Sequence, residues 1–303
     1  MRLRIGGLIR RIQRYSTSSS WFAPGPTKHV KIDDEERGVD SYDLPTRFHP
    51  QSSFHMIKMI LLVLLALLFV VLLLGYTIYK PPQFVINYLR WKYPDVLFQI
   101  PLSHAHRVIA LTIDDAPSEE TSRILDLLKI YDSKATFFII GSQVSAHPSL
   151  IQRIHDEGHE LGNHAWADEP SISLPISELE RQVKEVEDLL PPNRPISGSK
   201  IPPKYFRPGS GFFNAQMLEK AKQWGYRVAL GSIYPHDPQI YNARINAKHV
   251  LSMARPGGII IMHDRRSYSA AEIELVLGGL KKRKYRVESL GGLLGVAGIN
   301  QAV

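Results

Sequence analysis

The chain has 303 residues, of which 44% are hydrophobic and 22% are charged, an ordinary composition for a folded protein of one or two domains. It contains no cysteine, which excludes disulfides and leaves its redox compartment open. The formal net charge of +8 is not accompanied by an aromatic and basic motif of the kind that reads nucleic acids, so we expect no nucleic-acid partner.

The first 79 residues divide into a polar tail and an apolar segment. Residues 1–58 are rich in serine, proline and arginine, carry the acidic cluster DDEE at 33–36 and show little periodicity, which predicts a disordered tail. Residues 59–79 contain no charged residue, and this length can cross a hydrocarbon core of about 30 Å. The pattern predicts a transmembrane helix. A buried core helix is the alternative, although such helices rarely lack a polar face.

Residues 80–103 read as an amphipathic connector flanked by prolines, and residues 104–303 as the folded domain. In this domain, strands are predicted at 108–113, 134–140, 159–164, 205–209, 226–232 and 257–264. Helices are predicted around 145–156, 176–190 with Ser177 as a cap, 214–224, 243–254 and 268–283. The alternation of strands and helices predicts an α/β fold with a mostly parallel sheet or a barrel.

Polar residues recur where these strands end. They are Asp114 and Asp115 after the first strand, then His164 with Asp168 four positions later, and Arg207, Asp237 and His263 after later strands. Because the carboxyl ends of parallel strands meet at one edge, we expect these side chains to converge. Carboxylates and neutral imidazole are zinc ligands, and a metal with an open position binds and acidifies water.

The paired aspartates suit such a centre, since one could hold the metal while the other takes a proton from its water. A separate histidine could protonate a leaving group. The alternative is that Asp115 or Ser118 only caps the following helix and that Asp114 is solvated.

These motifs resemble the NodB-type polysaccharide deacetylases, carbohydrate esterase family 4, over roughly residues 105–290. The resemblance implies a distorted (β/α) barrel. Residues 112–117 look like the family's Thr-Phe-Asp-Asp-Gly-Pro, which implies Asp114 as general base and Asp115 as a metal ligand. His164 and Asp168 fall on its His-x-x-x-His motif, which implies two further ligands of one divalent metal ion. Zinc is the first candidate, and cobalt, manganese and iron are alternatives.

The remaining motifs imply the other functional groups. Arg207 begins the Arg-x-x-x-Gly motif and would orient the base, and Asp237 would tune His263, the general acid in IIIMHD. The expected substrate-binding residues are Gly209, Ser210, whose backbone N–H would contact the oxyanion, and Trp166, which either lines a sugar subsite or packs.

The main departure from the family pattern is Asp168, which replaces the second histidine. A carboxylate can still bind zinc, but two carboxylates would leave the bound metal without residual charge and weaken its pull on the water's proton. The harder ligand set also shifts metal preference slightly toward manganese or iron. Ala116 and Ile113 are further departures, standing for a glycine and an aromatic residue.

The resemblance predicts a metal-dependent N-deacetylase of an N-acetylhexosamine polymer or oligomer such as chitin. A non-catalytic glycan-binding or scaffold protein and an O-acetyl esterase are the alternatives. A glycan-type domain after a single span predicts a type II membrane protein of the secretory pathway or cell surface, although residues flanking the span do not favour either side. The first twenty residues are rich in arginine and serine and free of acids, which leaves a mitochondrial membrane protein as the rival location.

Overall fold

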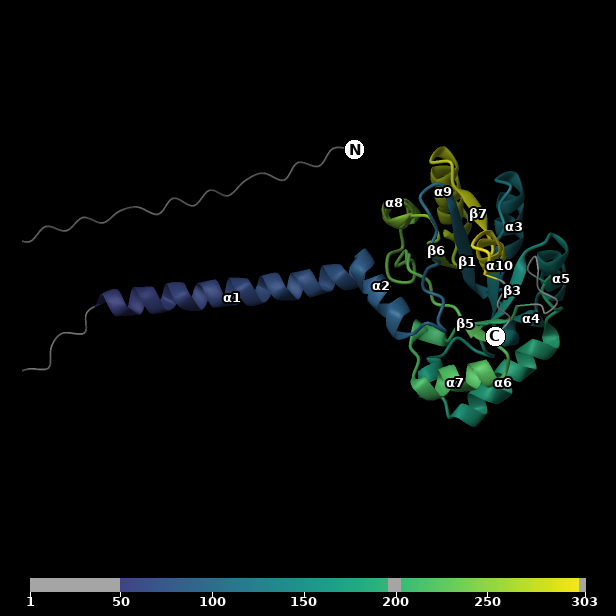
Figure 1. The fold of residues 1–303 in the computed structure, drawn as a ribbon, viewed down its shortest axis with the longest axis horizontal. Coiled ribbons are helices and arrows are strands. Elements are labelled where there is room, and N and C mark those ends of the chain that lie inside the picture. Colours follow the sequence, from purple (N-terminus) through teal and green to yellow (C-terminus); the bar gives the residue numbers. More distant parts are fainter. Residues whose placement is uncertain (1–49, 196–202, 300–303) are drawn as a thin grey trace, which may run out of the picture. The chain divides into compact units, whose positions relative to one another are not determined.

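The computed structural model describes residues 50–195 and 203–299 (Figure 1). Its helices are α1 (Pro50–Tyr79), α2 (Gln83–Lys92), α3 (Thr121–Ile130), α4 (Gly141–Val144), α5 (Pro148–Asp156), α6 (Ile176–Leu189), α7 (Ala215–Gln223), α8 (Ala243–Met253), α9 (Ser269–Lys282) and α10 (Leu290–Val296). Short 3₁₀ turns occur at Ser171–Ser173 and Gly209–Gly211.

The strands form one parallel sheet. They are β1 (Val108–Ala116), β2 (Thr136–Ile139), β3 (Glu160–Asn163), β4 (Tyr205–Phe206), β5 (Arg227–Val228), β6 (Ile259–His263) and β7 (Arg286–Glu288). Their order is β5-β4-β3-β2-β1-β6, and β7 also pairs with β1. A parallel bridge between Ile233 and Ile260 joins the segment after β5 to β6 and curls the sheet. This curled parallel sheet with its helices confirms the predicted fold class of a distorted barrel.

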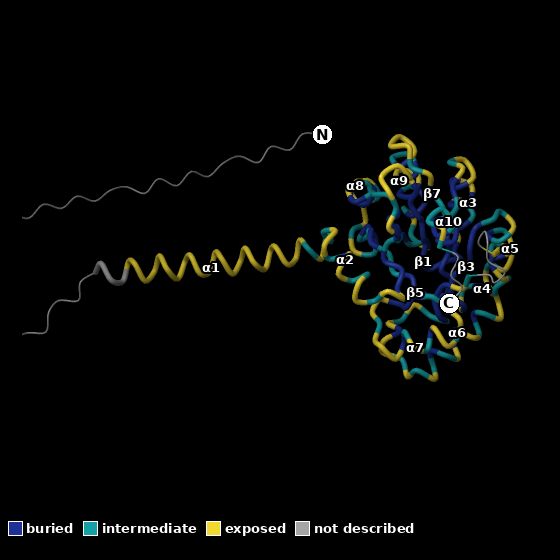
Figure 2. The backbone as a smooth tube through the Cα atoms, in the orientation of Figure 1, coloured by how far each residue is buried: buried dark blue, intermediate teal, exposed yellow. Residues whose placement is uncertain are grey.

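Strand β1 lies inside the sheet, between β2 and β6, and is buried on both faces. All nine of its residues are buried, and it contacts β2, β6 and β7. Helices α3, α8 and α9 cover it with apolar side chains such as Leu125, Val250 and Ile273. Figure 2 shows β1 in dark blue, the buried class, so its carboxyl end is held by the surrounding core residues.

Several predicted elements differ from those observed. The helix predicted at 145–156 begins at Pro148 as α5, the short helix α4 before it was not predicted, and α6 begins after Pro175 rather than with a Ser177 cap. The strand predicted at 226–232 is only two residues long as β5. Helix α10, after the last strand, was not predicted. Such boundaries depend on tertiary packing more than on local sequence.

Helix α1 contains the predicted span. Its segment Phe54–Tyr79 contains an 18-residue stretch with a mean hydropathy of 3.2 and, by length and composition, could cross a membrane. The predicted tail at 1–58 lies mostly outside the described residues, and its last nine residues belong to α1, so the helix begins earlier than residue 59. The predicted connector at 80–103 contains the helix α2.

Candidate active site

The two aspartates lie within the last three residues of β1 rather than in the loop after it. Neighbouring side chains of a regular strand point to opposite faces. Here the β1–β2 register shifts between Ile113 and Ala116, and Asp115 adopts a left-handed conformation with φ of 64°. This irregularity redirects Asp115, so that Asp114 and Asp115 both line one cavity of about 590 Å³.

Asp114 forms an ion pair with a buried arginine. Arg207 Nη1 donates to Asp114 Oδ1 at 2.5 Å and to Thr112 Oγ1 at 2.8 Å, while its Nε donates to the Ala229 carbonyl at 2.7 Å. Its guanidinium also lies 4.1 Å from the centroid of the Phe138 ring. Burial lowers the pKa of Arg207, and the adjacent Asp114 opposes that shift. The guanidinium remains protonated and holds the Asp114 carboxylate by this contact.

Asp115 and His164 form a second buried pair. His164 Nδ1 lies 2.6 Å from the carbonyl of Arg207, which can only accept a hydrogen bond, so Nδ1 carries the proton. In the neutral ring Nε2 then presents a lone pair, and it lies 3.7 Å from Asp115 Oδ1. Two electron-pair donors that face each other at this distance fit a shared cation. Burial raises the pKa of Asp115, and His164 opposes that shift.

The structure does not bring Asp168 to this pair. Asp168 is exposed, and its Oδ2 lies 2.6 Å from Nη2 of Arg265, which is also 3.6 Å from Asp115 Oδ2. Within residues 50–195 and 203–299, no three His, Asp or Glu side chains are grouped so that they could hold a metal ion. Two of the three predicted ligands therefore fit a metal as they stand, and the third is paired with an arginine of the same chain.

His263, which also lines the cavity, is paired with Asp237. Its Nδ1 lies 2.7 Å from Asp237 Oδ1, and its backbone N–H donates to Asp237 Oδ2 at 3.0 Å. Burial lowers the pKa of His263, but the hydrogen bond and charge of Asp237, together with the charges of Asp114 and Asp115, outweigh that effect and raise it to about 9. A protonated imidazole that is held in one orientation is suited to donate a proton. In the sheet, His263 on β6 pairs in register with Asp114 on β1.

The predicted substrate-binding residues have three different positions. Ser210 lines the cavity at its exposed edge and has a left-handed φ of 64°. Gly209 is buried, donates its N–H to Ser171 Oγ at 2.8 Å, and does not line the cavity. Trp166 is half-buried, packs against Gly141 and does not line the cavity either. Of the three, Ser210 alone faces the space that Asp114 and His263 share.

Other residues of the site were not predicted. Asp264 is buried and accepts hydrogen bonds from Ser118 Oγ at 2.6 Å and from Thr121, which ties the end of β6 to the loop after β1. It also accepts the backbone N–H of Arg265 at 2.6 Å. The sequence signal was present, because the polar residues at 264 and 265 directly follow His263 at a strand end. Thr112, which supports Arg207, could have been noticed as a hydroxyl residue within an apolar strand.

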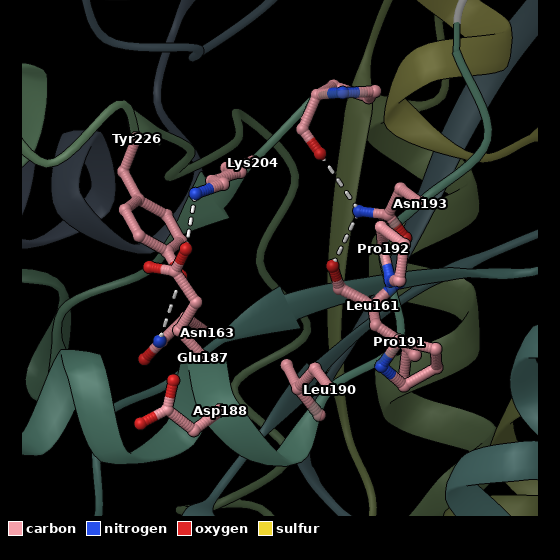
Figure 3. Close-up of a pocket in the computed structure, with 11 residues that line it drawn as sticks. Leu161, Asn163, Glu187, Asp188, Leu190, Pro191, Pro192, Asn193, Lys204 and Tyr226 are labelled. Carbon is pink, nitrogen blue, oxygen red and sulfur yellow. Dashed lines mark hydrogen bonds and ion pairs between the residues drawn. The ribbon is translucent and has the colours of Figure 1, made fainter. Parts of the chain in front are cut away.

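A second cavity, of about 410 Å³, lies between α6, β3 and the segment before β4 (Figure 3). Asn193 there donates from Nδ2 to the carbonyls of Leu161 and Pro203 at 2.8 and 3.0 Å, and Lys204 pairs with Glu187. None of the predicted site residues lines it. Its contacts join strand β3 to the segment before β4, which is a structural role.

Comparison with known proteins identifies relatives of this domain. The family model described as polysaccharide deacetylase matches residues 103–229. A peptidoglycan-N-acetylglucosamine deacetylase of Bacillus cereus is 32% identical over 215 residues, which are 69% of this chain and 93% of that protein. The solved structure of the peptidoglycan deacetylase PdaC of Bacillus subtilis has 31% identity and a TM-score of 0.57, covering 64% of this chain and 93% of that one.

Another relative is considerably longer than the matched region. The peptidoglycan-N-acetylglucosamine deacetylase PgdA of Listeria monocytogenes is 33% identical over 199 residues, which are 65% of this chain but only 41% of PgdA. The similarity therefore concerns one domain of that protein.

Proposed function

Because the chain belongs to the polysaccharide deacetylase family, we propose that its domain hydrolyses the acetamide group of N-acetylhexosamine units in a glycan. The observation that carries this proposal is that two supported ionisable groups line one cavity, Asp114 paired with Arg207 and His263 paired with Asp237. A carboxylate base and an imidazolium acid in one site are what amide hydrolysis requires. Relatives named for peptidoglycan make peptidoglycan N-acetylglucosamine the first substrate to test, ahead of the chitin suggested by sequence.

In this proposal Asp114 accepts the proton of a water molecule as the water attacks the acetamide carbonyl carbon. Arg207 holds the carboxylate in place by its hydrogen bond to Oδ1. The backbone N–H of Ser210 donates to the oxygen that becomes negative. His263 then gives its Nε2 proton to the departing amine as the carbon–nitrogen bond breaks, since Nδ1 is held by Asp237. The products are acetate and a free amino sugar.

We further propose that a divalent metal, zinc first, is held by Asp115 and His164, with Asp168 as third ligand after it leaves Arg265. When bound, such an ion polarises the carbonyl and lowers the pKa of coordinated water. The buried Asp115–His164 pair supports this assignment, since the lone pair on Nε2 faces a carboxylate. Cobalt, manganese and iron remain alternatives for the same ligands.

A non-catalytic glycan-binding or scaffold role is the second candidate. The observation that favours it is the ion pair between Asp168 and Arg265, because it removes one expected metal ligand from the site. The presence of both Asp114 and His263 argues against it, since glycan binding needs no acid–base pair. An O-acetyl esterase is a third possibility that the same residues could serve, because an ester is cleaved by the same attack.

We propose that α1 anchors the domain as the single span of a type II membrane protein, with residues 80–303 lumenal or extracellular. The mean hydropathy of 3.2 in an 18-residue stretch of Phe54–Tyr79 supports a span. The proposed glycan substrate supports a lumenal or extracellular domain. A mitochondrial membrane remains the alternative location.

The test is acetate release by the full chain from peptidoglycan, chitooligomers and an O-acetylated glycan, before and after chelation and with zinc restored. Deacetylation that is lost in Asp114→Asn and His263→Ala, while both variants remain folded, supports the proposal. An activated aryl acetate separates the two roles, because its leaving group needs no proton and its hydrolysis should survive His263→Ala better. A folded wild type that binds chitooligomers but releases no acetate from any substrate would favour the glycan-binding role.

A further inference from the structure

Helix α2 presents an aromatic face that no other described residue covers. Phe84, Tyr88 and Trp91 have exposed fractions of 71%, 51% and 78%. They are spaced four and three residues apart, so at about 100° per residue they lie within an arc of about 60° on the helix surface. The rings of Tyr88 and Trp91 are 6.0 Å apart. Figure 2 shows exposed turns in this helix.

The opposite face of α2 is already used for packing. Ile86 is 3% exposed, and Leu89 packs with it against the core cluster that also holds Phe206 and Val228. Tyr93, just after the helix, packs edge-on against Phe213 with ring centroids 5.0 Å apart. The helix is therefore fixed to the domain by one side, and the position of its aromatic face is set by the fold.

The other exposed large apolar side chains of residues 80–195 and 203–299 are scattered. They include Ile130 at the end of α3, Phe212 at the cavity edge, and Tyr241 with Ile245 near α8. Single exposed apolar residues are normal and need no partner. Three aromatic residues on one face of a ten-residue helix are a different case, because each exposes a large apolar area to water.

The position of α2 in the chain indicates what covers this face. Lys80, Pro81 and Pro82 alone separate it from the end of α1, so its first residue lies at most about 14 Å from Tyr79. The apolar segment Phe54–Tyr79 has 26 residues, or about 39 Å of helix, which exceeds a hydrocarbon core of about 30 Å. If α1 spans the bilayer, its end and the start of α2 both fall in the headgroup region.

The charged residues between Lys80 and Pro94 also fit the headgroup region. Residues 80–94 contain Lys80, Arg90 and Lys92 and no acidic residue. Lys92 Nζ lies 5.8 Å from the Tyr88 ring centroid and 5.4 Å from that of Tyr93, beside the aromatic face. Aromatic rings flanked by lysine and arginine are the side chains that settle at a membrane–water boundary.

We propose that α2 lies in the membrane interface, with Phe84, Tyr88 and Trp91 inserted among the lipids and its basic side chains facing anionic headgroups. This inference rests on the proposed span. It adds that the domain is held on the membrane surface by a second contact, which limits how far the catalytic cavity can turn from the bilayer.

The test uses the full chain in vesicles of phosphatidylcholine, with or without phosphatidylglycerol, containing lipids brominated near the headgroup. Trp91 is one of four tryptophans, and its emission is obtained by subtracting that of Trp91→Phe. We expect the wild type to lose a larger fraction of its emission to bromine than Trp91→Phe does. Trp91 should also resist quenching by aqueous iodide, and the lipid contact should strengthen with phosphatidylglycerol.

A matched pair of variants tests the aromatic face. Phe84→Gln with Tyr88→Gln should make Trp91 accessible to iodide, whereas Ile130→Gln with Tyr241→Gln, which removes exposed apolar side chains elsewhere, should not. Both variants should stay in the membrane fraction after alkaline carbonate, because α1 is intact.

Three results would overturn the inference. If Trp91 is open to iodide and untouched by bromine in a chain that resists carbonate, the span stands and the α2 contact does not. If the emission of Trp91 instead responds to added chitooligomers, or to protein density in the membrane, the face binds a glycan or a second copy of the chain. If carbonate extracts the wild type, the span itself is wrong and the inference falls with it.

Discussion

Arg265 and Asp168 form an ion pair at 2.6 Å, and the same Nη2 of Arg265 lies 3.6 Å from Asp115. The chain therefore places its own cation beside two carboxylates that were predicted to hold a metal. The backbone of Arg265 is held by Asp264 and Ser118, and its φ of 68° is left-handed. The arginine and a divalent ion would compete for the same negative charge.

Arg265→Gln should consequently bind Zn²⁺ more tightly than the wild type, by about tenfold, or about 1.4 kcal/mol. The substitution removes the competing charge and frees Asp168. Competition with a chromogenic chelator measures the affinity directly and independently of activity. Arg244→Gln, which removes an exposed positive charge from α8, is the control for net charge. Equal or weaker zinc binding by Arg265→Gln would mean that the arginine orients Asp168 for the metal instead.

Asp168 itself can be tested by two substitutions at one position. Asp168→Ala should lose zinc and activity, because the third ligand is gone, while Asp168→His should keep both, because imidazole is a normal zinc ligand. Metal content by mass spectrometry and acetate release are measured together. If Asp168→Ala retains near-stoichiometric metal and near-normal activity, Asp168 is not part of the site.

Removing the charge of Asp114 should destabilise the fold as well as the reaction. The side chains of Arg207 and Asp114 are 3% and 5% exposed, so Asp114→Asn leaves a buried guanidinium without its counter-charge. We expect the free energy of unfolding to fall by about 3–5 kcal/mol, as measured by urea denaturation. Thr112→Val, which removes a neutral partner of the same Nη1, should cost less. Equal losses in the two variants would show that the charge pair contributes little beyond its hydrogen bond.

The raised pKa of His263 predicts how deacetylase activity declines at alkaline pH. His263 must be protonated to act as acid, so activity should fall as the pH rises through about 9. In Asp237→Asn the negative charge is removed and the hydrogen bond is weakened while burial still lowers the pKa of His263, so the alkaline limb should move to lower pH. Tyr268→Phe, which loses only a bond to the Asp237 carbonyl, should leave the limb in place.

The same pKa has a consequence for stability. Because the folded pKa of His263 lies above the ordinary value of 6.5, its protonation stabilises the fold fully below pH 6.5. That contribution is lost as the pH rises from 6.5 through about 9. In urea denaturation followed across this window, the wild type should lose more stability than Asp237→Asn. A parallel decline in both proteins would show that another group titrates.

Two glycines next to Ser210 allow the stability cost of a steric clash to be compared with that of an unfavourable backbone conformation. A Cβ at Gly209 would lie 2.1 Å from the Glu169 carbonyl oxygen, so Gly209→Ala must displace backbone and should cost about 1–3 kcal/mol. Gly211 has a φ of 71° but open space around it, and Gly211→Ala should cost about 1 kcal/mol through its backbone conformation. Thermal denaturation compares the two. A smaller loss for Gly209→Ala would contradict the close approach of Glu169.

The sequence alone determined the alternation of strands and helices, the long apolar segment and the residues that gather at the strand ends. It could do so because an apolar run buried on both faces is visible in one dimension, and because parallel strands bring their carboxyl ends to one edge. Asp114, Asp115, His164, Arg207 and His263 all line the cavity, as that reasoning required.

Only the tertiary structure decided which of these groups face each other. The irregularity at Asp115 depends on backbone angles. Two other contacts join residues far apart in the chain: the hydrogen bond from His164 to the Arg207 carbonyl and the ion pair between Asp168 and Arg265. The exposed aromatic face of α2 could not be predicted either, because the amphipathic pattern of 80–103 did not reveal which side of the helix the domain would cover. Local sequence carries periodicity, whereas the choice of an ion-pair partner depends on packing between elements.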